Sequence, residues 1–151
     1  GQTRQTAAHA FQGENIGNGQ VEQVPFNLPS GFDVDGFLQG ALSHYRTVQQ
    51  AWNEADFDSL AEYLTPELTA EIKSQHQSLD EAPKTEILYL DAELVRANQQ
   101  LGLSEISILF KGRCKDDTEQ TEDAIYDIWH LEKDENQGTA NWIIVGIEAS
   151  E

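Results

Sequence analysis

Acid–base chemistry in a folded domain needs a carboxylate or a histidine held among apolar walls, where burial shifts its pKa. The candidates, with hydroxyl donors beside them, are Asp91, Asp127, His130, Tyr45 and Tyr126. Strand alternation puts Asp127 on the face of Ile125 and Trp129, so it is the better candidate for a buried acid. A pocket enzyme of isomerase or dehydratase type would use Asp127 as base and Tyr45 or Tyr126 as donor. A buried carboxylate bonded to backbone or tyrosine is the commoner arrangement.

The spacing of the histidines, acidic residues and glycines does not match a metal, phosphate-binding or nucleophilic site. His44, His76 and His130 form no pair at zinc-ligand spacing, and His44 is interpreted as a surface or boundary residue. The acidic run over residues 116–123 lacks the alternating pattern and central glycine of a calcium loop. No phosphate loop, dinucleotide fingerprint or nucleophile elbow is present, and the single cysteine, Cys114, is expected in the core. We therefore expect no metal, no cofactor and no catalytic residues.

A short basic stripe stands out on this acidic chain. Lys111, Arg113 and Lys115 alternate along one expected strand and so share a face. This stripe could contact an acidic lipid head or partner. Pairing with acids of the next strand, such as Glu122, is the favoured interpretation because cross-strand ion pairs commonly stabilise hairpins.

The elements that must position these residues begin with helices. Apolar residues recur at three- and four-residue intervals from Asp33, a plausible N-cap, to about Ala55. Asp56 can cap a short second helix. Thr65 as cap, followed by Pro66 at the first helical position, predicts a third helix.

After the third helix the apolar period changes to two. Four strands are expected, at residues 85–97, 104–115, 122–133 and 141–148, separated by short polar breaks. The fold class is therefore α+β, with three N-terminal helices packed on a curved four-stranded antiparallel sheet around an apolar interior.

The composition indicates how the chain divides into a linker and a domain. The 151 residues are 38% hydrophobic, and no apolar run approaches the roughly 20 residues of a transmembrane helix. Residues 1–28 are rich in Gln, Gly, Asn and Ala and are expected to form a flexible linker, leaving residues 29–151 as the domain. Because the chain begins with Gly1 and contains no Met, we expect it to derive from a longer protein that carried any signal or membrane anchor.

The net charge of the chain disfavours some classes of binding partner. Nine basic and 27 acidic residues give a net charge of −18. Such a chain repels phosphate backbones and anionic headgroups at long range, which disfavours nucleic acid and a broad anionic lipid surface as partners.

A series of short runs also falls in a known order. They are residues 28–33, Phe37-Leu38, Ala41, Gln49, Ala51-Trp52, Asp56, residues 64–68, Glu71, Phe110, Gly112, residues 127–129 and residues 142–147. This ordered set covers about residues 28–148 and resembles the Tim44-like domain family, the C-terminal domain of a mitochondrial inner-membrane import subunit and its bacterial relatives.

The resemblance implies a cone-shaped fold similar to nuclear transport factor two, with a deep apolar pocket. It also implies a place on the inner membrane, where the mitochondrial domain tethers the import motor to the translocon. Asp127 stands where that family more often has Glu, and the excess of acid argues against cardiolipin binding.

We accordingly expect a non-enzymatic, membrane-associated interaction domain that binds a lipid, a peptide or a membrane protein through its pocket. The residues expected to line that pocket are Phe37, Ala41, Tyr45, Leu68, Ile72, Phe110 and Trp129. The expected location is the cytoplasmic side of a bacterial inner membrane. Monomer and homodimer both remain open.

Overall fold

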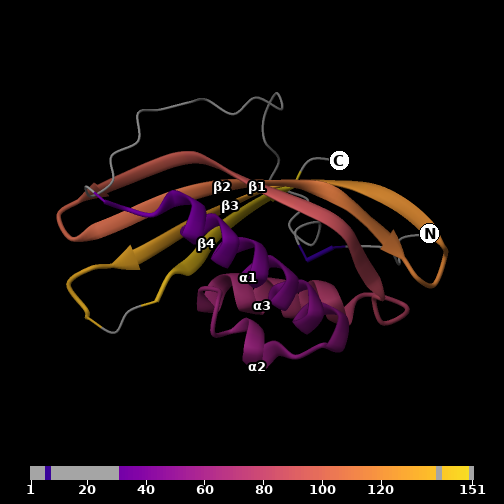
Figure 1. The fold of residues 1–151 in the computed structure, drawn as a ribbon. Helices are drawn as coiled ribbons and strands as arrows, with labels where there is room; N and C mark the ends of the chain where they lie inside the picture. The colour runs from indigo at the N-terminus through magenta and orange to yellow at the C-terminus, as the bar shows by residue number, and fades with distance from the viewer. Residues whose placement is uncertain (1–5, 8–30, 139–140, 150–151) are drawn as a thin grey trace.

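Helices cover one face of an antiparallel sheet in the computed structural model, which describes residues 6–7, 31–138 and 141–149 (Figure 1). The elements are α1 (Val34–Glu54), α2 (Phe57–Leu60), α3 (Pro66–Gln77), β1 (Thr85–Gln100), β2 (Leu103–Asp116), β3 (Thr121–Asp134) and β4 (Ile143–Ala149). This order confirms the predicted α+β class. The predicted linker at residues 1–28 lies outside the described residues, apart from residues 6–7.

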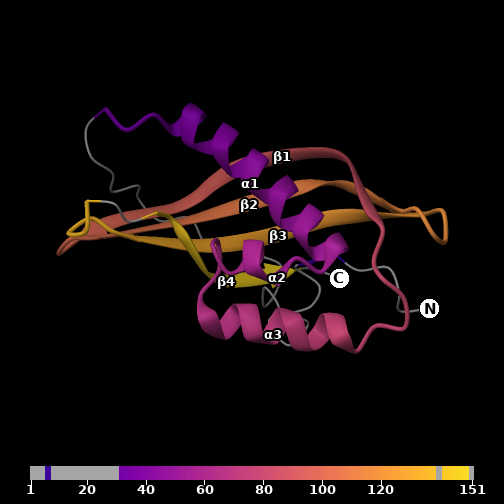
Figure 2. The same cartoon turned by 90° about the horizontal axis from the view of Figure 1, so that it is seen from below.

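Helix α1 begins and ends where the sequence predicts. The Asp33 side chain accepts a hydrogen bond from the Gly36 backbone N–H at 3.0 Å, and Ala55 ends the helix in the left-handed region at φ 56°. The helix crosses the strands obliquely (Figure 2). Its inward stripe buries Tyr45 and Trp52 in the main core.

Caps also define the two shorter helices. Asp56 accepts from the Ser59 N–H at 3.1 Å, and Thr65 accepts from the Leu68 N–H at 3.2 Å, as predicted. The link between these helices pairs with the sheet edge, since Ile144 N–H donates to the Tyr63 carbonyl at 2.8 Å. Tyr63 is thereby fixed next to β4.

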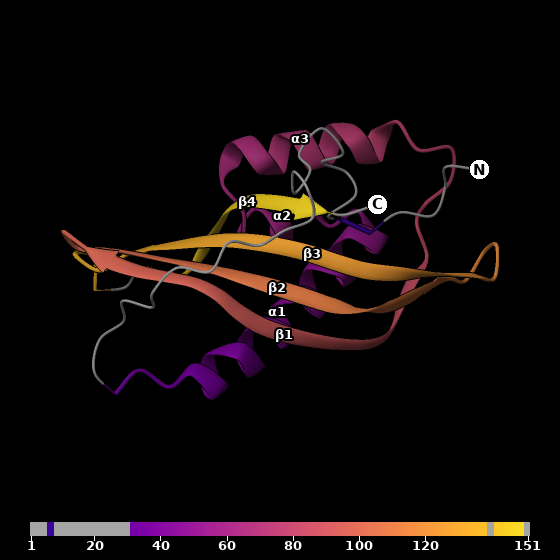
Figure 3. The same cartoon turned by 90° about the horizontal axis from the view of Figure 1, so that it is seen from above.

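The strands follow one another in the order β1-β2-β3-β4, each antiparallel to its neighbour. Leu101 and Gly102, with φ of 53° and 79°, make the two-residue turn between β1 and β2. β1 and β4 are both edges, so the sheet is open, and its strands are curved (Figure 1). Its other face carries no described helix (Figure 3).

β1 departs from simple alternation at Leu88, which a strict period of two would put on the same face as Leu90. The pairing of β1 with β2 shifts between Ile87 and Tyr89, so Leu88 is the extra residue of a β-bulge and is 41% exposed. Leu90 belongs to the main core. The bulge also brings the Tyr89 carbonyl over Gly112 of β2.

The described ranges include no helix with the length and apolar character needed to cross a bilayer.

Candidate functional site

A buried polar pair lies in the main core. The Tyr45 hydroxyl on α1 donates a hydrogen bond to Asp127 Oδ2 on β3 at 2.5 Å, and the two residues are 2% and 1% exposed. Burial, reinforced by the charge of Asp127 and its hydrogen bond, raises the pKa of the Tyr45 hydroxyl well above its ordinary value. The phenol therefore stays protonated and remains the donor of this pair.

Aromatic rings seal the pair from solvent. The Tyr45 ring stacks on Trp129 with centroids 5.0 Å apart and packs against Phe110 at 4.7 Å. Both partners are themselves buried. A substrate would have no access to Tyr45 or Asp127 in this arrangement, so the pair joins α1 to β3 as a structural contact.

The other acid–base candidates lie elsewhere. Tyr126 packs on a second apolar cluster, on the sheet face turned away from the helices, so it cannot act with Asp127 as the pocket-enzyme hypothesis requires. Asp91 is exposed. His130 also faces away from the helices, because it alternates with Trp129 along β3.

A cavity of about 210 Å³ lies between α1 and the β3–β4 side of the sheet, and we call it the α1 pocket. Its wall consists of Gly36, Phe37, Gly40, Ala41, His44, Tyr63, Trp129, Leu131, Trp142 and Ile144. Two ring pairs shape this wall: Phe37 meets Trp142 edge-on at 5.3 Å, and His44 meets Tyr63 edge-on at 5.1 Å. The α1 pocket is thus almost entirely apolar and largely aromatic.

An added Cβ would meet different surroundings at the two glycines of the wall. A Cβ at Gly36 would lie 2.4 Å from Asp33 Oδ2, so the N-cap of α1 accounts for this residue. A Cβ at Gly40 would meet no atom within 4 Å, and Gly40 lies within α1 without a positive φ. Neither packing nor backbone conformation accounts for Gly40.

A second, more polar hollow of about 340 Å³ adjoins the α1 pocket. Its lining is His44, Glu62, Tyr63, Lys133, Asn141 and Trp142. Since His44, Tyr63 and Trp142 belong to both linings, the apolar and polar hollows share a wall. His44 is exposed there, as the sequence predicts.

The seven residues expected to line a pocket fall into three groups. Phe37, Ala41 and Trp129 line the α1 pocket. Tyr45 and Phe110 pack behind Trp129. Leu68 and Ile72 on α3 belong to the main core and are not part of the pocket wall.

The sequence interpretation missed several wall residues, among them Gly40, Tyr63 and Trp142. Gly40 could have been identified from the sequence, because a glycine inside a helical pattern requires a packing or functional explanation. Tyr63 lies outside the regular elements, where periodicity carries no information about direction. Trp142 falls within the expected strand at residues 141–148, but β4 begins one residue later, at Ile143.

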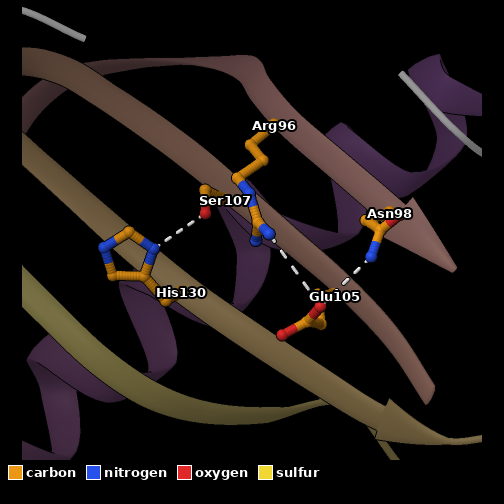
Figure 4. A network of polar contacts seen from close by, with 5 residues as sticks. All are labelled: Arg96, Asn98, Glu105, Ser107 and His130. Carbon is orange, nitrogen blue, oxygen red and sulfur yellow. Dashed lines mark hydrogen bonds and ion pairs between the residues drawn. The ribbon is translucent and has the colours of Figure 1, made fainter. Parts of the chain in front are cut away.

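The outer sheet face carries a polar network across the strands (Figure 4). His130 lies between Ser107 Oγ, 2.7 Å from its Nδ1, and Glu148 Oε2, 2.6 Å from its Nε2. On the neighbouring strands Glu105 contacts Arg96 at 3.9 Å and accepts from Asn98 at 3.3 Å.

The Ser107–His130–Glu148 series has the residue types of a nucleophile, base and acid. Ser107, however, is 3% exposed and lies in the middle of a strand that is paired on both sides. Its surroundings leave no room for an acyl substrate. We interpret the series as a link that holds β4 to β2 and β3.

The basic stripe is engaged in ion pairs at two of its three positions. Arg113 lies 3.4 Å from Glu122, as the favoured interpretation predicts, and Lys111 lies 3.8 Å from Glu93 on β1. Within the described part of the chain, no cluster of three or more His, Cys, Asp or Glu side chains could hold a metal ion.

The family profile described as Tim44-like domain matches residues 23–149, which is most of the chain. No curated protein matches the sequence.

Proposed function

Because this chain belongs to the Tim44-like domain family, we propose that it is a non-enzymatic, membrane-associated interaction domain that binds an apolar group of its partner in the α1 pocket. Such domains generally serve interaction and not catalysis. The helices and curved sheet around the pocket support a nuclear-transport-factor-two-like fold. The partner is a lipid or a membrane protein, and the bacterial inner membrane is the proposed site.

Gly40 is the observation that carries this proposal. Glycine inside a helix costs about 1 kcal/mol relative to alanine, because it loses more conformational freedom on folding. A methyl group at this position would meet nothing, so stability alone favours alanine. Gly40 lies at the exposed edge of the pocket wall, so a helix-destabilising glycine there is consistent with a binding site whose entrance must stay clear.

Trp129 adds a second indication. Its indole N–H is buried and finds no hydrogen-bond acceptor among the described residues, an arrangement that costs about 1–3 kcal/mol in a plain core. Such unsatisfied groups are rare in native interiors and concentrate at functional sites. Trp129 is a wall residue of the α1 pocket.

Filling the pocket tests the proposal. In Gly40→Leu the new side chain is expected to extend over the apolar wall and block the α1 pocket, so the affinity for octyl glucoside, a neutral probe with an apolar chain, is expected to fall at least tenfold. The thermal midpoint is expected to stay equal or rise, since leucine is the better helix former by about 0.8 kcal/mol. Calorimetric titration and thermal unfolding measure the two quantities.

Gln39→Leu is the matched control for Gly40→Leu. Gln39 is the exposed neighbour on the same helix and is not a wall residue, so its replacement adds equal apolar surface outside the pocket. Binding is expected to remain within twofold of wild type. Equal loss of binding in both variants, or full binding in Gly40→Leu, contradicts the proposal.

A further inference from the structure

We infer that the group taken by the α1 pocket is an organic cation on an apolar chain, an alkylammonium group. This inference rests on the proposed function and adds the charge of the ligand. Three observations carry it: the aromatic wall, the acidic rim and the charge of the whole chain.

Aromatic rings make up half of the pocket wall. Four of its ten residues are Phe, Tyr or Trp, namely Phe37, Tyr63, Trp129 and Trp142, and the imidazole of His44 is the fifth ring. The negative face of an aromatic ring attracts a cation, and sets of such rings recognise quaternary ammonium groups. Each contact contributes about 0.5–2 kcal/mol, the larger values applying where water is excluded. The faces of these rings give an anion no such attraction, and the unpaired Trp129 indole N–H offers a single hydrogen bond that a neutral or an anionic acceptor could take.

The rim of the pocket carries acidic groups. The Asp33 carboxylate lies against Gly36 of the wall, and Glu62 lines the adjoining polar hollow. Lys133 also lines this hollow but lies 3.9 Å from Glu135, which offsets its charge. Glu62 takes part in no ion pair within the described residues. The local balance at the rim is therefore negative.

The net charge of −18 acts in the same direction at longer range. A strongly acidic domain raises the local concentration of cations and lowers that of anions, more so at low ionic strength. An anionic amphiphile would meet an acidic rim and a wall without a cationic side chain. A cationic amphiphile is attracted by the net charge, by the rim carboxylates and by the ring faces, and the one lysine of the adjoining hollow is paired with Glu135.

Three amphiphiles with one chain length test the inference by calorimetric titration, each below its micellar concentration. They are octyltrimethylammonium, octyl glucoside and octane sulfonate. We expect the affinity to fall in that order, with the cation at least tenfold above the neutral compound at low salt. Gly40→Leu is expected to weaken binding of the first two, which places them in the same pocket.

Paired charge variants localise the effect. Glu62→Gln is expected to reduce the preference for the cation over octyl glucoside at least threefold. Glu71→Gln makes the same charge change on the exposed side of α3, away from the pocket, and is expected to leave the preference unchanged. An equal effect of both variants overturns the role of the rim.

The outcomes separate this inference from the proposed function. If octyl glucoside and the cation bind equally and Gly40→Leu removes both, the pocket proposal stands and the cation inference is wrong. If octane sulfonate binds most tightly, the inference is also wrong. If none of the three amphiphiles binds to wild type, both proposals fail together.

Discussion

Replacing Gly112 by alanine is expected to lower the free energy of unfolding by about 3 kcal/mol, the upper part of the usual range for overpacked positions. A Cβ at Gly112 would lie 2.1 Å from the Tyr89 carbonyl oxygen and 3.1 Å from the Leu90 Cα, both backbone atoms. Backbone cannot rotate aside as a flexible side chain can. The β-bulge of β1 would have to move away from β2, with loss of the hydrogen bonds around it.

Chemical unfolding of Gly112→Ala against wild type measures this loss. Gly40→Ala is the matched control, since it makes the same chemical change where a Cβ meets no atom. That variant is expected to gain up to about 1 kcal/mol from helix propensity. Equal stability of Gly112→Ala and wild type would mean that β1 does not approach β2 as described.

Replacing Tyr45 by phenylalanine is expected to lower the free energy of unfolding by about 2 kcal/mol. The change keeps the stacked ring but removes the hydroxyl that donates to Asp127, and hydrogen bonds to charged groups contribute about 1.5–3 kcal/mol. A double-mutant cycle with Asp127→Asn isolates the pair from the remaining contacts of Asp127. A loss below about 0.5 kcal/mol in Tyr45→Phe would contradict the described pair.

Tyr45→Phe is also expected to change how steeply the free energy of unfolding falls as the pH rises above about 10. The pKa of Tyr45 is raised in the folded protein, first by burial, so its contribution is fully present below the unfolded value of about 10. Above that pH the unfolded state loses its proton while the folded state keeps it, and stability falls by up to about 1.4 kcal/mol per pH unit. Tyr45→Phe should lack this contribution, giving a shallower decline from pH 10 upward.

Local chemistry made much of the fold predictable. Asp33, Asp56 and Thr65 each accept the N–H three residues on, because short polar side chains satisfy the free donors of a helix start. The four strands follow from a period of two between polar breaks, although β1 runs on to Gln100, beyond the expected end at residue 97, and β4 begins at Ile143, after the expected start at residue 141. In each case the determining interaction lies within a few residues of sequence.

Features that depend on long-range register were not predictable. The bulge at Leu88 changes which residues of β1 face inward, and no local pattern marks it. His130 meets Ser107 and Glu148 only because three strands align in one register. The convergence of Tyr45 and Asp127 was foreseen as a possibility, but their isolation behind Trp129 depends on how α1 crosses the sheet.

The α1 pocket illustrates the same limit. Phe37 and Ala41 could be assigned to it from the helical stripe of α1. Leu68 and Ile72 have the same pattern on α3, yet they fill the core, since periodicity identifies an inward face without saying whether a neighbour occupies it. Gly40 on α1 lines the pocket, whereas none of the residues of α3 does.

The most direct test of pocket binding uses the three tryptophans as reporters. Trp129 and Trp142 line the α1 pocket, whereas Trp52 is buried in the core and is not a wall residue. In ¹H–¹⁵N spectra of the whole chain titrated with octyl glucoside, the indole signals of Trp129 and Trp142 are predicted to shift saturably, and that of Trp52 to stay in place. Gly40→Leu should abolish these shifts. Three unchanged indole signals in wild type at saturating probe, or a shift of Trp52 alone, would contradict binding in the α1 pocket.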